Sequence, residues 1–153
     1  MRTKDWGCCY EPIPVGDAIT PAPTPIQYRQ VLDADATIRL LAYTTETLLA
    51  EKLQTMLKRG AMTTRPRDFY DIYKLETSAR FDAAVFLAAV DATFRNRKSE
   101  SLIPRRYEIL ESIRRSVVVK ELWEKYRKRF SYASEITWEM VLASAKRLFD
   151  LLP

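Results

Sequence analysis

Histidine is absent from this chain of 153 residues, and glycine and cysteine are scarce, with three and two copies. Without histidine, neither a Ser-His-Asp nor a Cys-His mechanism is possible, so Lys, Asp, Glu and Tyr remain as the acid–base groups. The adjacent Cys8 and Cys9 provide neither a disulfide framework nor a four-ligand zinc site. Gly7, Gly16 and Gly60 are too scattered to form a glycine-rich phosphate loop.

Long apolar runs are missing as well. No stretch approaches the roughly 20 apolar residues of a membrane span. No secretory signal is visible either, so we expect a cytoplasmic location and no membrane partner. The residues that are present, 47% of them hydrophobic, suffice for one buried core.

The predicted fold class is mainly α, an α+β arrangement in which a helical bundle follows a short irregular or β segment at the N-terminus. Residues 1–37 are rich in proline and include a possible strand at residues 26–32. Residues 38–153 form the expected helical domain, which a second short strand at residues 38–43 introduces.

Turn and capping residues divide this domain into separate helices. Pro66 should begin the second helix, with Thr63 or Thr64 as its cap, and Ser134 should cap the last one. The apolar helix at residues 82–96 is predicted to lie at the centre of the core. The helices are expected at residues 45–59, 66–75, 82–96, 105–118, 122–130 and 134–152.

Lys52 lies within the apolar stripe of the first expected helix. It falls four residues after Leu48 and four before Met56, so its ammonium must either extend to solvent along its methylene stem or meet a negative partner. Solubility does not require a lysine here, because the exposed face is already polar. That face is expected to carry Glu51, Gln54, Thr55 and Lys58. We therefore interpret Lys52 as a candidate functional residue.

Asp68, on the second expected helix, is the candidate partner of Lys52. Asp68 lies at the edge of the apolar face, and Asp71 lies four residues after Arg67, within reach of an ion pair. Because few residues separate the two helices, they should form an antiparallel hairpin in which Lys52 faces Asp68.

Structural explanations for these charges stay open. Acidic residues in a first helical turn are favoured by the helix dipole by roughly 0.3–1 kcal/mol, and Arg67 with Asp71 is an ordinary surface pair. Lys52 and a carboxylate can equally form a structural ion pair, although buried pairs contribute little net stability.

Two stretches of this region, AEKLQTMLKRG followed by TRPRDFYDIYKL, resemble the AbiEii/AbiGii nucleotidyltransferase toxins of bacterial type IV toxin–antitoxin systems. The likeness extends upstream through VGDAITP and LLAYTTETLLAEKL, and downstream through FDAAVFLAAVDATFRNRKS. It covers most of this chain, but only the later, C-terminal half of the family's usual chain.

The resemblance implies a nucleotidyltransferase fold that moves a nucleoside monophosphate from a nucleoside triphosphate to an acceptor, in some members tRNA. Nucleoside triphosphate and Mg²⁺ would be the cofactors and a cognate antitoxin the protein partner. Lys52 matches the lysine that would neutralise the triphosphate. Asp68 and Asp71 match active-site aspartates, and Arg67 could contact phosphate. Strands within residues 1–37 would be remnants of the nucleotidyltransferase core.

The sequence departs from the family at the metal site, which requires a glycine-led turn followed by paired aspartates. Asp33 and Asp35 have suitable spacing but no such turn, so we interpret them as a solvated turn. Pro12 stands where a further aspartate is usual, with Glu11 out of register. We therefore expect no metal ligands, and a truncated toxin that is inactive by itself. The alternative is a non-catalytic helical module that binds nucleic acid or an antitoxin.

Positive charge is concentrated between residues 95 and 129, where 12 basic residues accompany 5 acidic ones. Such a cluster could bind a phosphate backbone of tRNA or another RNA, or could simply be the solvated face of amphipathic helices. The candidate nucleic-acid contacts are Arg105, Arg106, Arg114, Arg115, Lys125, Arg127, Lys128 and Arg129.

Overall fold

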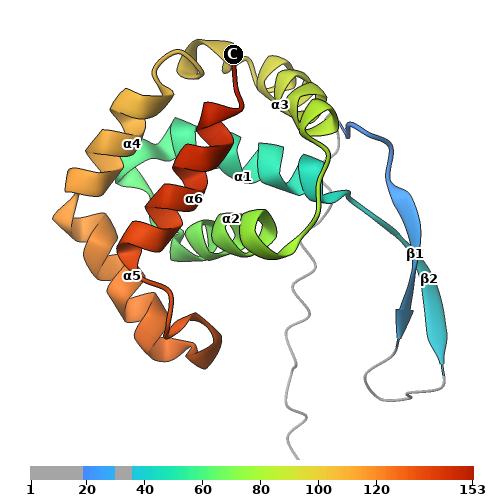
Figure 1. The fold of residues 1–153 in the computed structure, drawn as a ribbon, viewed down its shortest axis with the longest axis horizontal. Coiled ribbons are helices and arrows are strands. Elements are labelled where there is room, and N and C mark those ends of the chain that lie inside the picture. The colour runs from blue at the N-terminus through green and yellow to red at the C-terminus, as the bar shows by residue number, and fades with distance from the viewer. Residues whose placement is uncertain (1–18, 30–35) are drawn as a thin grey trace, which may run out of the picture.

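The structure is a computed structural model that describes residues 19–29 and 36–153. Within these residues the fold is mainly α, as predicted, with a bundle of helices beside one two-stranded hairpin (Figure 1). The strands are β1 (Thr24–Arg29) and β2 (Thr37–Ala42). The α-helices are α1 (Thr45–Arg59), α2 (Pro66–Ser78), α3 (Ala83–Asn96), α4 (Arg106–Arg115), α5 (Val117–Arg129) and α6 (Trp138–Asp150). Short 3₁₀ helices are η1 (Gly60–Met62), η2 (Glu100–Leu102) and η3 (Ser131–Ala133).

The β1–β2 hairpin is antiparallel and lies to one side of the bundle, next to the start of α1 (Figure 1). Ile26 pairs with Leu40 and Tyr28 with Ile38, so these four apolar side chains share one face of the ribbon, and all four are exposed. The second strand lies within one residue of its predicted position. The first begins two residues earlier than predicted, and the end predicted for it lies outside the described residues.

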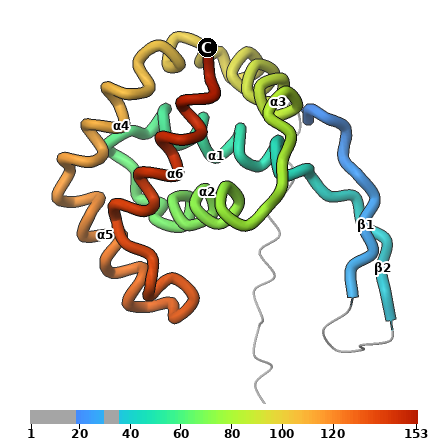
Figure 2. Tube along the Cα trace, in the orientation of Figure 1, coloured from blue at the N-terminus to red at the C-terminus, as the bar shows by residue number. Residues whose placement is uncertain are grey.

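Helix α1 lies in the middle of the bundle, with α2, α3 and α4 packed against it (Figure 2). Its residues Leu49 and Leu53 are fully buried. Helix α3 packs mainly against α1, burying Phe86 and Phe94 while leaving Ala84 exposed. The prediction that α3 is the central helix was therefore wrong. The apolar composition of α3 suggested burial on all sides, but only one face of the helix is packed.

Helix α6 packs on α2 and completes the core there. The rings of Phe69 and Trp138 meet edge to face, with centroids 5.3 Å apart. At the other end of this contact, Arg147 donates from Nε and Nη2 to the two carboxylate oxygens of Glu76. The apolar contact holds α6 near the start of α2, and the charged contact holds it near the end of α2.

Two predicted helix caps and one predicted helix break were wrong. Helix α6 is capped by Thr137, whose Oγ1 accepts from Met140 N, and not by Ser134. The residue before α2 is Arg65, which makes no side-chain cap, although Pro66 is the first helical residue as predicted. Ser116 ends α4 and caps α5 through Val119 N. The predicted break near residues 119–121 therefore lies at Ser116.

Candidate functional site

Lys52 lies between two carboxylates of α2. Its Nζ is 2.7 Å from Asp68 Oδ1 and 3.0 Å from Asp71 Oδ2. The predicted facing of Lys52 and Asp68 is confirmed, and Asp71 joins them. We call these three residues the Lys52 cluster.

The turn between α1 and α2 makes this meeting possible. Gly60 ends α1 with φ of 50° and ψ of −136°, a combination that a residue with a Cβ rarely adopts, and its N–H bonds Met56 O. One turn of η1 follows, and α2 then runs back along α1 (Figure 1). The first turns of α2 thereby come to lie beside the middle of α1, where Lys52 is.

The Lys52 cluster lies at the border between core and solvent. The side chains of Lys52, Asp68 and Asp71 are 26%, 11% and 23% exposed. Burial alone would lower the pKa of Lys52, but the hydrogen bonds and negative charges of Asp68 and Asp71 outweigh it and raise that pKa above its ordinary value. Lys52 therefore carries a full positive charge at neutral pH and remains reachable from solvent.

Arg67 makes a looser contact with the same group. Its Nε lies 4.0 Å from Asp71 Oδ2, and its side chain is mostly exposed. The predicted spacing of four residues does bring Arg67 and Asp71 together, at the outer limit of an ion pair. Arg67 is thus placed at the solvent side of the Lys52 cluster.

The Lys52 cluster does not fit a divalent metal ion. The place between its two carboxylates is taken by the ammonium of Lys52, which would repel a second cation there. In residues 19–29 and 36–153, no three His, Cys, Asp or Glu side chains gather in a way that could hold a metal. Glu11, Pro12, Asp33 and Asp35, considered above for the family's metal site, lie outside the described residues.

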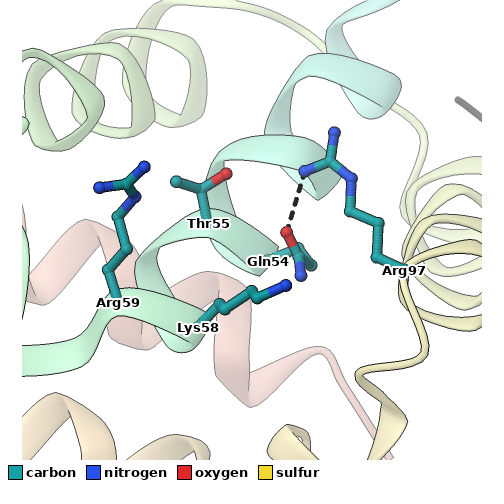
Figure 3. Close-up of a pocket in the computed structure, with 5 residues that line it drawn as sticks. All are labelled: Gln54, Thr55, Lys58, Arg59 and Arg97. Atoms are coloured by element: carbon teal, nitrogen blue, oxygen red, sulfur yellow. Dashed lines mark hydrogen bonds between the residues drawn. The ribbon is translucent and has the colours of Figure 1, made fainter. Parts of the chain in front are cut away.

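A second group of polar residues, which sequence reasoning missed, surrounds an open hollow of about 490 Å³ beside α1. Figure 3 shows three cationic side chains, Lys58, Arg59 and Arg97, around this space. Gln54 and Thr55 complete the lining. We call these five residues the cationic hollow. The expectation that Gln54 lies on an exposed face was wrong, because it is 1% exposed.

Arg97 comes to the cationic hollow from the end of α3. Its Nη1 donates to Gln54 Oε1 at 2.9 Å, and Glu51 Oε1 lies 3.9 Å from its Nη2. The sequence carried one weak signal of this arrangement. Gln54 falls between apolar Leu53 and Met56 on α1, where a polar residue requires a hydrogen-bonding partner.

The predicted nucleic-acid contacts do not form one continuous group. Arg106 and Arg115 begin and end α4, so they are separated by about 13 Å of helix. Several of these arginines are held by nearby acceptors: Arg105 by Glu108, Arg114 and Arg115 by Glu111, Arg106 by the carbonyl of Leu152, and Arg127 by that of Ser134.

The last three of these basic residues do lie together. Arg127, Lys128 and Arg129, at the end of α5, line an open hollow of about 510 Å³ with Glu124, Ser131 and Ser134. Lys125 is exposed one turn earlier on the same helix. The end of α5 is therefore the part of the predicted nucleic-acid surface that the structure brings together.

Comparison with models of known protein families gave a match. The family model described as "Nucleotidyl transferase AbiEii toxin, Type IV TA system" matches residues 11–144. No match was found among curated proteins or among solved structures. Among the described helices, none combines the length and the apolar character that crossing a membrane requires.

Proposed function

The chain belongs to the AbiEii family of nucleotidyl transferase toxins of type IV toxin–antitoxin systems, and from this premise we propose that its Lys52 cluster binds the triphosphate of a nucleoside triphosphate. The observation that carries the proposal is the position of Lys52, charged and still accessible, between Asp68 and Asp71. Membership in this family also implies an antitoxin as a protein partner.

The geometry supports a specific division of roles. An ammonium group has three N–H donors, and Asp68 and Asp71 each take one. The third is left for a phosphate oxygen, which the solvent-facing side of Lys52 can meet. Asp68 and Asp71 then act as positioning residues, because they fix the direction of the ammonium and keep it protonated. Arg67, at the solvent side, would add a second positive charge near the phosphates.

Such a site contributes electrostatics and not covalent chemistry. Phosphoryl and nucleotidyl transfer depend on neutralising the charge of the phosphates, and a preorganised ammonium in a partly buried place costs no reorganisation when the substrate binds. Nucleotidyl transfer in general uses a divalent metal, which would polarise the phosphates. The Lys52 cluster does not fit that ion, and no other group of ligands in residues 19–29 and 36–153 does, so we propose that the described residues do not catalyse transfer by themselves.

Calorimetric titration tests the nucleotide proposal. Each of the four nucleoside triphosphates would be titrated into the wild-type chain, with and without Mg²⁺, and into Lys52→Met. Loss of one charge-assisted contact should weaken binding at least about tenfold. The matched control is Lys74→Met, which removes an exposed lysine of α2. Equal affinity of wild type and a folded Lys52→Met variant would refute the proposal.

A second candidate function rests on the end of α5, where Arg127, Lys128 and Arg129 lie around one hollow. These side chains could bind the phosphate backbone of tRNA or another RNA, with an affinity that falls as salt rises. Replacement of all three by Gln should then abolish salt-sensitive RNA binding, whereas Lys52→Met should leave it unchanged. Unchanged RNA binding by the triple variant would exclude this candidate.

A further inference from the structure

We propose that the cationic hollow is a phosphate-binding site in its own right. It is separate from the Lys52 cluster, shares none of its residues, and does not depend on the proposed nucleotide contact at Lys52. The argument rests on how Arg97 is held, on the charges that surround the space, and on the chemistry of the side chains that line it.

A buried hydrogen-bond network holds Arg97 in place. Gln54 Oε1 accepts from Arg97, while Gln54 Nε2 donates to Ser99 Oγ at 3.2 Å. Ser99 Oγ in turn bonds the carbonyl of Phe94 at 3.3 Å. Both ends of the Gln54 amide are thus used, and Gln54 and Ser99 are almost fully buried. Burying a glutamine is unfavourable unless it is bonded in this way, so the network gives the Arg97 guanidinium a defined position.

Positive charge around the hollow exceeds the negative charge of Glu51, whose Oε1 lies 3.9 Å from Arg97 Nη2 and offsets one of the three cations. Lys58 and Arg59 are exposed, and neither makes an ion pair within residues 19–29 and 36–153. Their position in the last turn of α1 is favoured by the helix dipole. Arg97, the residue that caps the end of α3, is favoured in the same way by the dipole of its own helix. The two dipoles therefore account for a positive charge at each helix end, but not for the meeting of three such side chains around one space. Three cations gathered around one space attract an anion and repel one another without it.

The lining favours a phosphate group over a whole nucleotide. Its five residues include no aromatic or aliphatic side chain, so they offer no surface on which a base could stack. They do offer the positive charge of Arg97, whose guanidinium Gln54 and Glu51 hold in place, together with two further cations and the Thr55 hydroxyl, and these groups suit phosphate oxygens. The hollow is open to solvent, so the phosphate could be a free anion or part of an oligonucleotide backbone.

The test compares anions at constant ionic strength. Tripolyphosphate and a single-stranded oligonucleotide would each be titrated into the wild-type chain in chloride buffer, with binding followed by NMR shifts of the Thr55 and Arg97 amides. We expect saturable shifts with tripolyphosphate, and shifts with the oligonucleotide as well if its backbone is the natural source. Shifts no larger than those that chloride produces would overturn the proposal.

Matched variants separate this site from general electrostatics. Arg97→Gln and the surface pair Lys58→Gln/Arg59→Gln should each weaken tripolyphosphate binding at least about tenfold, because each removes a charge-assisted contact. Arg95→Gln removes the same charge from an exposed residue two positions away, and should leave binding within about twofold of wild type. Equal weakening by Arg95→Gln and Arg97→Gln would show a diffuse field and no site.

The outcome is also distinguishable from that of the Lys52 experiment. Lys52→Met should retain tripolyphosphate shifts at Thr55 and Arg97, even where it abolishes nucleotide binding. If Arg97→Gln does not fold, the double variant Lys58→Gln/Arg59→Gln, which changes only exposed side chains, still decides the question.

Discussion

The ammonium of Lys52 lies 2.7 Å from Asp68, although sixteen residues and a change of helix separate the two along the chain. The contact requires α1 to end where it does and α2 to return beside it. Stability and charge in this region are therefore coupled, and both can be measured.

Replacing Lys52 by Met should destabilise the fold, because Asp68 and Asp71 would keep their charges in a partly buried place without a counter-charge. We expect a loss of about 1–3 kcal/mol in the free energy of unfolding, measured by urea denaturation at pH 7. The additional changes Asp68→Asn and Asp71→Asn should recover part of the loss. A Lys52→Met variant as stable as Lys74→Met would contradict this expectation.

The stabilising effect of Lys52 should disappear in alkaline solution. Its folded-state pKa is raised above the ordinary value of 10.5, so the contribution is fully present below that value and is lost as the pH rises through the higher folded-state pKa. The stability difference between wild type and Lys52→Met should be constant from pH 7 to about 9.5 and shrink above about 10.5. A difference that grows with pH would reverse the sign of the argument.

Glu76 should show the opposite dependence. Its hydrogen bonds with Arg147 lower its pKa below the ordinary value of 4.5, against a smaller opposing effect of burial. Its contribution is therefore present above 4.5 and lost as the pH falls through the lower folded-state pKa. Because Arg147 is half exposed, we expect Glu76→Gln to lower the free energy of unfolding by only about 1 kcal/mol at pH 7. The loss should become progressively smaller below pH 4.5. Urea denaturation of wild type and Glu76→Gln at several pH values measures the loss at pH 7 and its decrease in acid.

Substitution of Gly60 should be destabilising through the backbone alone. A Cβ at this position would lie 3.6 Å from Ile109 Cγ2, an ordinary contact, so space is not limiting. The backbone angles are the obstacle, and Gly60→Ala should cost about 1–3 kcal/mol. Thermal denaturation followed by circular dichroism would detect this as a lower midpoint. An unchanged midpoint would mean that the turn adopts other angles without cost.

Two isoleucines, one in the core and one in the hairpin, should contribute differently to stability. Ile72 on α2 is fully buried, and Ile72→Ala should cost about 2–5 kcal/mol by leaving a cavity. Ile38 on β2 is 43% exposed, and Ile38→Ala should change stability by less than about 1 kcal/mol. Equal losses, measured by urea denaturation, would mean that the hairpin is as well packed as the bundle.

The contact of Lys52 with Asp68 could be predicted from sequence because two local patterns determine it, whereas that of Lys52 with Asp71 was not predicted. A lysine in an apolar stripe and an aspartate at the edge of another come together whenever a short turn joins their helices. The end of α4 was harder to locate, because residues 105–118 include no proline or glycine. Only the hydroxyl of Ser116, which caps α5, marks the break. Ser134 and Thr137 can both cap a helix by residue type. In the structure Thr137 caps α6, and Trp138, the next residue, packs against Phe69.

The cationic hollow could not be predicted in this way. Gln54 and Arg97 lie 43 residues apart, and their contact depends on the packing of α3 against α1. No periodicity within either helix specifies that packing. The polar position between Leu53 and Met56 indicates that Gln54 needs a partner, but not which one.

The packing of α6 on α2 affects how the chain folds during its synthesis. Glu76 and Arg147 are 71 residues apart, so α2 leaves the ribosome long before the helix that covers it. Until residues 138–150 emerge, the buried face of Phe69 and Ile72 has no final cover. Native contacts of such long separation form late and slow the folding of a helical protein. In the interval, this face of the nascent chain is a surface that a chaperone can bind.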